Sequence, residues 1–299
     1  MPTIRGALFL NPTAGARFAA AEASTLENLA KEAGLEVFRI GRGVDVSATI
    51  REQIGQGRKL FVAAGGDGTI SSVVQALVNS EAVLGVVPLG TYNHFARDLG
   101  VPLDWREAMD VALTGTVRQV DAGRVNDRFF VNNVSIGLYP ELVARREERG
   151  RDYRRWKARL HAAYATLRKY PHVTLAIETE YLHEIIRTHV FLVSNNSYDL
   201  SRIGVEAPRS TLEEGRLSVY WLPHIPRITL MRFIAHYLAG RVRNAPGFRS
   251  FRTTHLKAQS AKKRVSLGID GEVFAMAPPL VITSVPKSLL VKVPREGTV

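Results

Sequence analysis

The N-terminal part of the chain alternates short apolar runs with amphipathic stretches. Apolar runs bounded by turn residues predict strands, and apolar residues that recur every three or four positions predict helices. After residue 69, for example, Ile70, Val73, Val74 and Leu77 lie on one helical face. The predicted strands are residues 4–10, 36–40, 60–64 and 83–87, and the predicted helices are residues 19–33, 46–54, 70–78, 93–99 and 104–113. This alternation indicates a parallel sheet with helical crossovers.

The pattern changes after residue 113, where turn residues rather than helices separate the apolar runs. The predicted strands are residues 117–121, 129–135, 173–178, 185–194, 217–221, 250–258, 264–269 and 280–284. Helical patterns near residues 141–170 and 227–238 interrupt this series. Closely spaced strands of this kind favour an antiparallel second domain, with a boundary near residues 121–127.

Composition adds size and compartment to this picture. The 299 residues, 45% of them hydrophobic, suffice for two cores. No apolar run approaches the roughly 20 residues that cross a bilayer, so no transmembrane helix is expected. The N-terminus does not resemble a secretory signal, and the absence of cysteine excludes disulfides. The expected location is the cytoplasm, with peripheral contact to the inner face of the membrane as an option.

The net charge of +12 is concentrated in two segments. Residues 141–170 contain 10 Lys and Arg against 4 Asp and Glu, and residues 241–264 contain 8 against none. In the first segment an apolar face of aromatic and leucine side chains accompanies the basic residues. Such a helix suits an anionic membrane surface, although the same face also suits packing on its own domain. No nucleic-acid-binding motif accompanies the charge, so no nucleic-acid partner is expected.

A glycine loop follows the third predicted strand. Its residues are Gly65, Gly66, Asp67, Gly68 and Thr69. Glycines let backbone N–H groups approach an anion, and the N-terminus of the following helix carries partial positive charge. The loop therefore suits the phosphates of a nucleotide, although a tight turn capped by Asp67 or Thr69 has the same sequence. It matches neither the dinucleotide fingerprint nor the P-loop.

Two similar loops follow the first and fourth predicted strands. Residues 11–15 read Asn-Pro-Thr-Ala-Gly, and residues 88–93 read Pro-Leu-Gly-Thr-Tyr-Asn. Because the carboxyl ends of parallel strands meet at one edge of a sheet, the three loops are expected to surround one site. The expected nucleotide-binding residues are Asn11, Pro12, Gly15, Gly65, Gly66, Asp67, Gly68, Thr69, Gly90, Thr91 and Asn93.

These loops, the Val-Asp-Ala-Gly of residues 120–123 and the Ile-Asp-Gly-Glu of residues 269–272 resemble, in order, the diacylglycerol kinase catalytic-domain family. The resemblance spans nearly the whole chain. It implies an α/β plus all-β fold, with an N-terminal open parallel-sheet nucleotide-binding domain at residues 1–123 and a C-terminal antiparallel β-sandwich-like domain at residues 124–284. It also implies a cleft between them and a last segment, residues 285–299, that returns to the first domain.

The resemblance further implies transfer of a phosphoryl group from ATP with Mg²⁺ as cofactor. It assigns Asp270 as the base that takes the proton from the acceptor hydroxyl, with Glu272 and Asp121 beside it as catalytic carboxylates. Asp67 and Asp121 are then the carboxylates expected to hold Mg²⁺, directly or through water. The residues alone leave other roles open, because Asp270 also suits a hairpin turn and Asp121 a turn.

Two positions depart from the family pattern. His94 stands where the family has an aspartate, and an imidazole does not supply the negative charge that attracts Mg²⁺. Weakened metal binding, a different donor or acceptor, and loss of activity are the three hypotheses. Residues 213–217 read Glu-Glu-Gly-Arg-Leu where the family has Asp-Asp-Gly-x-Leu beside a structural cation, which Glu214 and Leu217 would hold here.

The function expected from the resemblance is an ATP-dependent lipid kinase that phosphorylates a hydroxyl of diacylglycerol or a related lipid. An NAD kinase-like activity is the enzymatic alternative. A nucleotide- or lipid-binding protein that has lost catalysis is the second alternative, and His94 motivates it. The expected partners are a lipid substrate and an anionic membrane contacted through residues 141–170, and a homodimer is one option for the oligomeric state.

Overall fold

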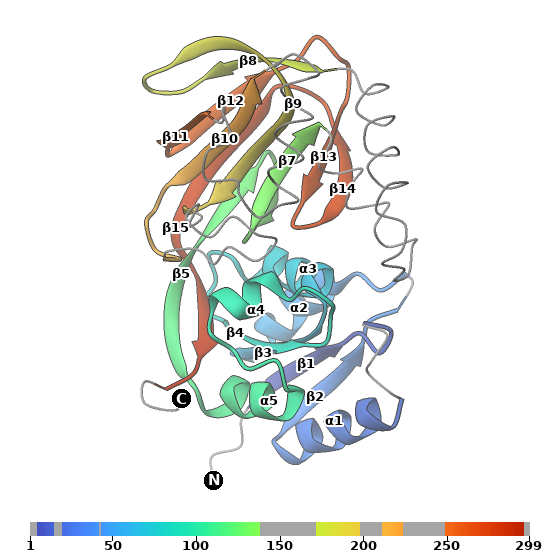
Figure 1. Ribbon diagram of the computed structural model, residues 1–299. Coiled ribbons are helices and arrows are strands. Elements are labelled where there is room, and N and C mark those ends of the chain that lie inside the picture. The colour runs from blue at the N-terminus through green and yellow to red at the C-terminus, as the bar shows by residue number, and fades with distance from the viewer. Residues whose placement is uncertain are drawn as a thin grey trace, which may run out of the picture.

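The computed structural model describes residues 5–14, 20–41, 43–137, 172–197, 211–223 and 249–295. The predicted helical stretches at residues 141–170 and 227–238, and the loop residue Gly15, lie outside the described residues. Within them the molecule has two stacked halves, joined by two long strands that run through both (Figure 1).

The N-terminal half is the predicted alternation of strands and helices. Its elements are β1 (Gly6–Leu10), α1 (Ala20–Glu32), β2 (Leu35–Arg39), α2 (Val46–Gly55), β3 (Leu60–Gly65), α3 (Asp67–Leu77), β4 (Val83–Pro88), α4 (His94–Asp98) and α5 (Trp105–Thr114). All pairings among β2, β1, β3 and β4 are parallel. Helices cover both faces of this sheet (Figure 1), which is why every residue of β1 and β3 is buried and apolar or glycine.

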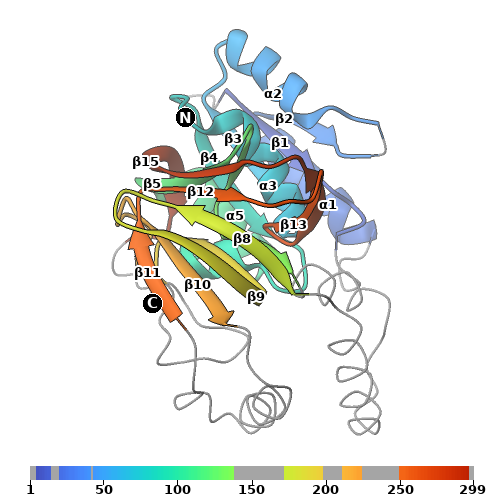
Figure 2. The same ribbon diagram turned by 90° about the horizontal axis from the view of Figure 1, so that it is seen from above.

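The C-terminal half is antiparallel. Its strands are β5 (Thr116–Val125), β6 (Arg128–Phe130), β7 (Asn133–Gly137), β8 (Val173–Glu178), β9 (His183–Asn195), β10 (Leu217–Pro223), β11 (Arg249–Thr253), β12 (His255–Gln259), β13 (Val265–Ile269), β14 (Glu272–Met276) and β15 (Leu280–Val293). Seen from above, β10 and β11 lie beside β9, on the side of the molecule opposite α2 (Figure 2). Parallel N-terminal and antiparallel C-terminal strands confirm the predicted fold class.

Three details of the second half differ from the prediction. The predicted strand 129–135 is divided into β6 and β7, and 250–258 into β11 and β12. At the second break Thr253 turns the chain, since its hydroxyl bonds to both the N–H and the carbonyl of His255. Strand β14 was missed, because its side chains are exposed or half-buried and give no strong apolar pattern.

Strands β5 and β15 tie the halves together. Residues 116–120 of β5 pair with 289–293 of β15, and residues 122–125 pair with 282–285, with an irregularity between the two blocks. Strand β15 also pairs in parallel with β4 through Leu290 and Val291. The two apolar cores therefore share these strands, because Leu289 and Val291 belong to the core of the parallel half, and Leu280 and Ile282 to the other. The exact limits of the two domains stay a prediction.

Candidate active site

The three predicted loops meet at the carboxyl edge of the parallel strands. The Asn11 amide donates to the Thr69 hydroxyl at 3.2 Å, and the Leu89 N–H donates to the Gly65 carbonyl at 2.9 Å. Gly66 and Gly90 are so close that a Cβ on Gly90 would lie 2.6 Å from the Cα of Gly66. So close an approach of two backbones requires glycine at residue 90. The loops after β1 and β4 thus contact the glycine loop from either side.

The glycine loop opens α3 without help from a side chain. Gly66 is the N-cap residue, and among the described residues no side chain caps this helix, whereas Asp45 caps α2 and Asp104 caps α5. The alternative of a turn capped by Asp67 or Thr69 is therefore not what the structure shows. The first N–H groups of α3 lack an intrahelical partner, as at every helix start, and these groups suit an anion.

Asn93 shapes the loop after β4 rather than projecting from it. Asn93 is buried and has φ 52°. Its side-chain oxygen accepts the N–H of Gly90 at 3.0 Å, and its side-chain NH₂ donates to the carbonyl of Gly90 at 2.9 Å. Thr91, by contrast, is exposed. Pro12 is half-buried beside Asn11.

Asp67 and His94 lie close together, as expected from the three loops. Burial raises the pKa of Asp67, while the charge of His94 and the backbone N–H groups of residues 93–95 act to lower it. Among the described residues the Oδ1 atom of Asp67 is buried and has no hydrogen-bond partner. His94 is exposed and stacks on Tyr92, with ring centroids 5.7 Å apart.

A divalent cation fits the Asp67 carboxylate. A buried carboxylate oxygen without a partner is costly unless a positive group faces it, and Mg²⁺ prefers such oxygen ligands together with water. No three His, Asp or Glu side chains among the described residues gather closely enough to hold an ion by themselves. An ion at Asp67 would therefore take its other ligands from phosphate and water.

Asp270 is the first residue of a two-residue hairpin. Asp270 and Gly271 connect β13 to β14 with φ 47° and 93°, and Ile269 pairs with Glu272, which is the type I′ arrangement. The buried carboxylate accepts backbone N–H groups from Val131, Asn132 and Asn133 at 2.8–3.1 Å. A carboxylate offers about four lone-pair directions, so these bonds occupy most of them.

Glu272 brings the antiparallel half to the glycine loop. A Cβ on Gly68 would lie 2.5 Å from Oε1 of Glu272, so this carboxylate rests directly against the loop. Beside it, α2, α3 and the β13–β14 hairpin enclose a pocket of about 200 Å³. The polar residues that line it are Asp45, Ser47, Ser71, Ser72, Gln75, Arg128 and Glu272.

Two of the pocket residues, Gln75 and Arg128, carried no signal in the sequence. Gln75 exchanges two hydrogen bonds with the backbone of Phe129, and Arg128 lies 4.2 Å above the Phe274 ring. The Gln75 bonds join α3 to β6 across the pocket, and the Arg128 contact joins β6 to β14. Neither residue belongs to a motif, and only the fold shows that they meet.

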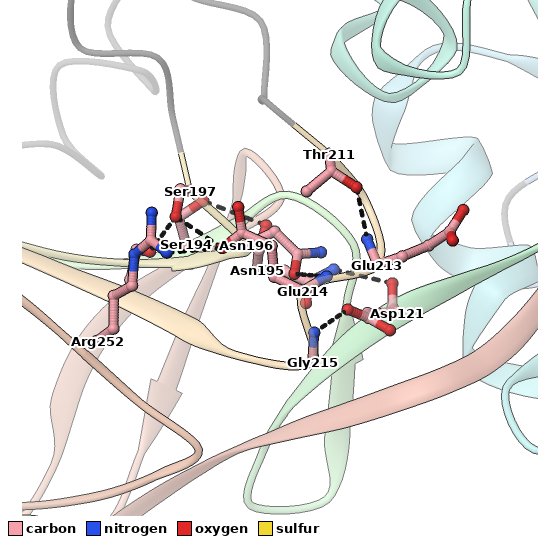
Figure 3. Close-up of polar contacts among 11 residues, drawn as sticks. Asp121, Ser194, Asn195, Asn196, Ser197, Thr211, Glu213, Glu214, Gly215 and Arg252 are labelled. Carbon is pink, nitrogen blue, oxygen red and sulfur yellow. Dashed lines mark hydrogen bonds and ion pairs between the residues drawn. The ribbon is translucent and has the colours of Figure 1, made fainter.

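Among the described residues, no contact joins Asp121 to Asp67. The buried carboxylate of Asp121 accepts the N–H of Gly215 at 2.6 Å (Figure 3) and the N–H of Lys287 at 2.8 Å. Because both oxygens bond to backbone, its geometry favours a structural role at the junction of β5 and β15 over the catalytic and metal-binding roles that the resemblance assigned. Those roles stay predictions.

The two residues assigned to a structural cation lie in a polar network. The Glu214 carboxylate accepts the Ser197 hydroxyl at 2.8 Å and lies 3.5 Å from the guanidinium of Arg252. Leu217 begins β10, in register with Asn195 on one side and Thr253 on the other. This network is close to Asp121, which bonds to the same loop (Figure 3).

Comparison with known proteins agrees with this architecture. Residues 5–125 match the model of the diacylglycerol kinase catalytic domain, and residues 134–293 match that of the YegS C-terminal NAD kinase beta sandwich-like domain. The chain is 34% identical over 144 residues to diacylglycerol kinase of Bacillus subtilis (strain 168), which covers 46% of this chain and 48% of that protein. It thus spans about half the length of the curated relatives it matches first.

Solved structures share the whole fold. A diacylglycerol kinase from Bacillus anthracis str. Sterne has a TM-score of 0.72 at 18% identity, over 100% of both chains. Yeast NADH kinase complexed with NADH has a TM-score of 0.54 at 14% identity, over 99% of this chain and 85% of the other. These identities establish the fold alone. The chain belongs to the diacylglycerol kinase catalytic-domain family, with a YegS C-terminal NAD kinase beta sandwich-like domain as its second half.

Proposed function

We propose that this protein is an ATP-dependent lipid kinase that phosphorylates a hydroxyl of diacylglycerol or a related lipid. The observation that carries the proposal is the meeting of three glycine-bearing loops at the start of α3, with the Glu272 carboxylate from the other half against Gly68. A phosphate site and a carboxylate at one edge of the same loop are what phosphoryl transfer to a hydroxyl needs.

In this proposal the glycine loop holds the phosphates of the nucleotide. The uncapped N–H groups at the start of α3 bind phosphate oxygens, and Gly65, Gly66 and Gly68 allow the backbone to approach them. Asp67, whose Oδ1 atom is buried without a hydrogen-bond partner among the described residues, would hold Mg²⁺, and the ion would supply positive charge to neutralise the transferred phosphoryl group. The pocket beside α3 receives the nucleoside, because Ser71 and Ser72 follow the loop directly and line it.

The geometry favours Glu272 over Asp270 as the group that takes the proton from the acceptor hydroxyl. Glu272 rests against the glycine loop, whereas most lone pairs of Asp270 are directed at the backbone of residues 131–133. Asp270 then fixes the hairpin from which Glu272 projects. This revises the role that the family resemblance gave to Asp270.

Phosphoryl transfer from radiolabelled Mg-ATP to a panel of lipids, with NAD in a parallel reaction, tests the function. Product with diacylglycerol or another lipid is the expected result. Product with NAD alone would favour the NAD kinase-like alternative. Nucleotide binding without turnover on any acceptor would favour a binding protein, and restored turnover in His94→Asp would then identify His94 as the cause.

Paired variants test the base. Glu272→Gln is expected to lower kcat at least a hundredfold with little change in melting temperature, because the residue is exposed. Asp270→Asn is expected to lower the melting temperature as well, because it turns an amide group toward the N–H groups of residues 131–133. Full activity in Glu272→Gln would show that this assignment is wrong.

The lipid must reach this site from a membrane, and no helix among the described residues is long and apolar enough to cross one. We propose that the basic segment 141–170 contacts the anionic surface, on the charge and aromatic pattern of its sequence. Flotation with liposomes that contain or lack anionic lipid tests this contact. Equal absence from both liposome fractions would remove the proposal.

A further inference from the structure

Two acidic residues of the loop 211–216 each face an arginine. Glu213 pairs with Arg118 of β5, and Glu214 pairs with Arg252 of β11. The two arginines come from different strands. Each carboxylate of the loop therefore has a fixed positive charge from the protein itself beside it.

Glu214 is the more enclosed of the two. Its side chain is 16% exposed, and its Oε2 atom accepts the Ser197 hydroxyl at 2.8 Å and lies 3.5 Å from Nη1 of Arg252. Its backbone N–H donates to Oδ1 of Asn196 at 3.0 Å, which fixes the backbone of the loop at this residue (Figure 3).

These residues do not fit a bound cation. A metal at Glu214 would lie within a few ångströms of the Arg252 guanidinium, and at a separation of about 4 Å two positive charges repel by several kcal/mol near a protein surface. Glu213 is directed to Arg118, and the backbone of Leu217 belongs to the β-ladder between β9 and β11. The loop thus departs from the structural cation that the family resemblance implies.

The loop is connected to the junction of the two halves. Asp121 accepts the Gly215 N–H, donates its own N–H to the Leu212 carbonyl, and accepts the Asn195 amide at its carbonyl. Asn195 also donates to the carbonyl of Val131, whose N–H bonds to Asp270. A chain of hydrogen bonds therefore connects the loop to residue 131, which bonds to Asp270 of the β13–β14 hairpin.

We infer that the Arg252 guanidinium takes the place of a bound cation. It holds the loop 211–216 through Glu214, so this loop needs no bound metal. Arg252 is a positioning residue that acts through Glu214. The inference concerns the fold of the loop and does not rest on the proposed function.

Thermal unfolding of the full chain without nucleotide, in EDTA and with added Mg²⁺ or Ca²⁺, tests the inference, together with metal analysis of the dialysed protein. The wild type is expected to retain no metal and to melt at one temperature in all three conditions. Arg252→Gln is expected to melt about 2 °C lower in EDTA and to recover on addition of the cation, because Glu214 is then unneutralised. Arg252→Lys keeps the charge and is expected to melt as the wild type.

Arg249→Gln is the matched control, since Arg249 lies on the same strand, is 63% exposed and pairs with Glu184 at 3.8 Å. It is expected to show no response to cations. Two results would overturn the inference. In the first, EDTA lowers the melting temperature of the wild type but not that of Glu214→Gln. This result would locate a metal at the loop. The other is an Arg252→Gln variant that melts as the wild type does in EDTA.

Discussion

Asp67 shows how the burial of a single carboxyl group can lower the stability of the folded protein. Burial is the largest influence on it and raises its pKa, although His94 and the N–H groups of residues 93–95 partly offset this. The group ionises more easily in the unfolded chain than in the folded protein. Its ionisation therefore lowers the free energy of unfolding as the pH rises above the ordinary pKa of 3.8. The stability lost in this way stays lost above the raised pKa.

Asp67→Asn is therefore expected to stabilise the protein at neutral pH. Removal of the buried charge is expected to raise the melting temperature at pH 7 by about 2–4 °C, which corresponds to roughly 1 kcal/mol. The gap is expected to close as the pH falls toward 3.8, where the carboxyl is protonated in both states. Melting curves from pH 7 to pH 4 measure it, with the exposed Asp127→Asn as control; a variant that melts below the wild type at pH 7 would contradict the argument.

The residue scale also shows what motifs leave open. The spacing of Asp270, Gly271 and Glu272 indicated both a hairpin and a carboxylate site, and the hairpin is confirmed. Which carboxylate faces the glycine loop depends on the backbone of residues 131–133, which is distant in the sequence and binds Asp270. The role of Asp121 also depends on distant residues, since its partners Gly215 and Lys287 come from two other segments.

Among the elements, the loops after β3 and β4 act as one unit because they touch backbone to backbone. A Cβ on Gly90 would lie 2.6 Å from the Gly66 Cα and 2.9 Å from Oδ1 of Asn93, and backbone atoms cannot rotate out of the way. The contact therefore sets the width of the predicted phosphate site.

Gly90→Ala is expected to weaken nucleotide affinity at least tenfold, because the two loops must separate to admit the methyl group. Calorimetric titration with a non-hydrolysable ATP analogue measures this, and a tenfold loss equals about 1.4 kcal/mol. Gly55→Ala is the control, since its added Cβ meets nothing within 4 Å apart from its chain neighbours and the backbone of its own helix. Unchanged affinity in Gly90→Ala would separate the loop contact from binding.

The β8–β9 hairpin is fastened to β11 by a carboxylate. The hydroxyl groups of Thr253 and Thr254 donate to Glu180 and lower its pKa to about 2. A lowered pKa stabilises the folded state above the ordinary value of 4.5, and this contribution is lost as the pH falls through about 2.

Glu180→Gln is expected to lower the free energy of unfolding at pH 7 by about 0.5 kcal/mol, a small value because solvent screens this exposed group. Below pH 4.5 the difference from the wild type is expected to shrink. Urea unfolding at pH 7 and pH 3 measures both values, with the exposed Glu81→Gln as control. A difference that grows toward pH 3 would contradict the assigned sign.

At the scale of the whole molecule, the two halves share β5 and β15. Leu289 is fully buried in the core of the parallel half, and Leu280 and Ile282 of the same strand are fully buried in the other core. A change in one core is therefore transmitted to the other along a continuous strand.

Leu289→Ala is expected to lower the free energy of unfolding by about 3 kcal/mol, the usual cost of a cavity in a packed core. The described halves are expected to unfold in a single transition that shifts as a whole. Calorimetry and denaturant unfolding followed by tryptophan fluorescence measure this, with the 45% exposed Leu103→Ala as control. Two transitions, of which only one moves, would show that the halves unfold separately.

The sequence by itself determined the alternation of strands and helices, the turn residues and the three loops, because these depend on local hydrophobic period and on backbone geometry that glycine, proline and asparagine permit. Tertiary structure alone decided that Glu272 rests on Gly68, that Asp121 bonds the backbone of two other segments, and that Arg252 faces Glu214. Each of these contacts joins residues far apart in the chain, and no local pattern records which distant strands will pair.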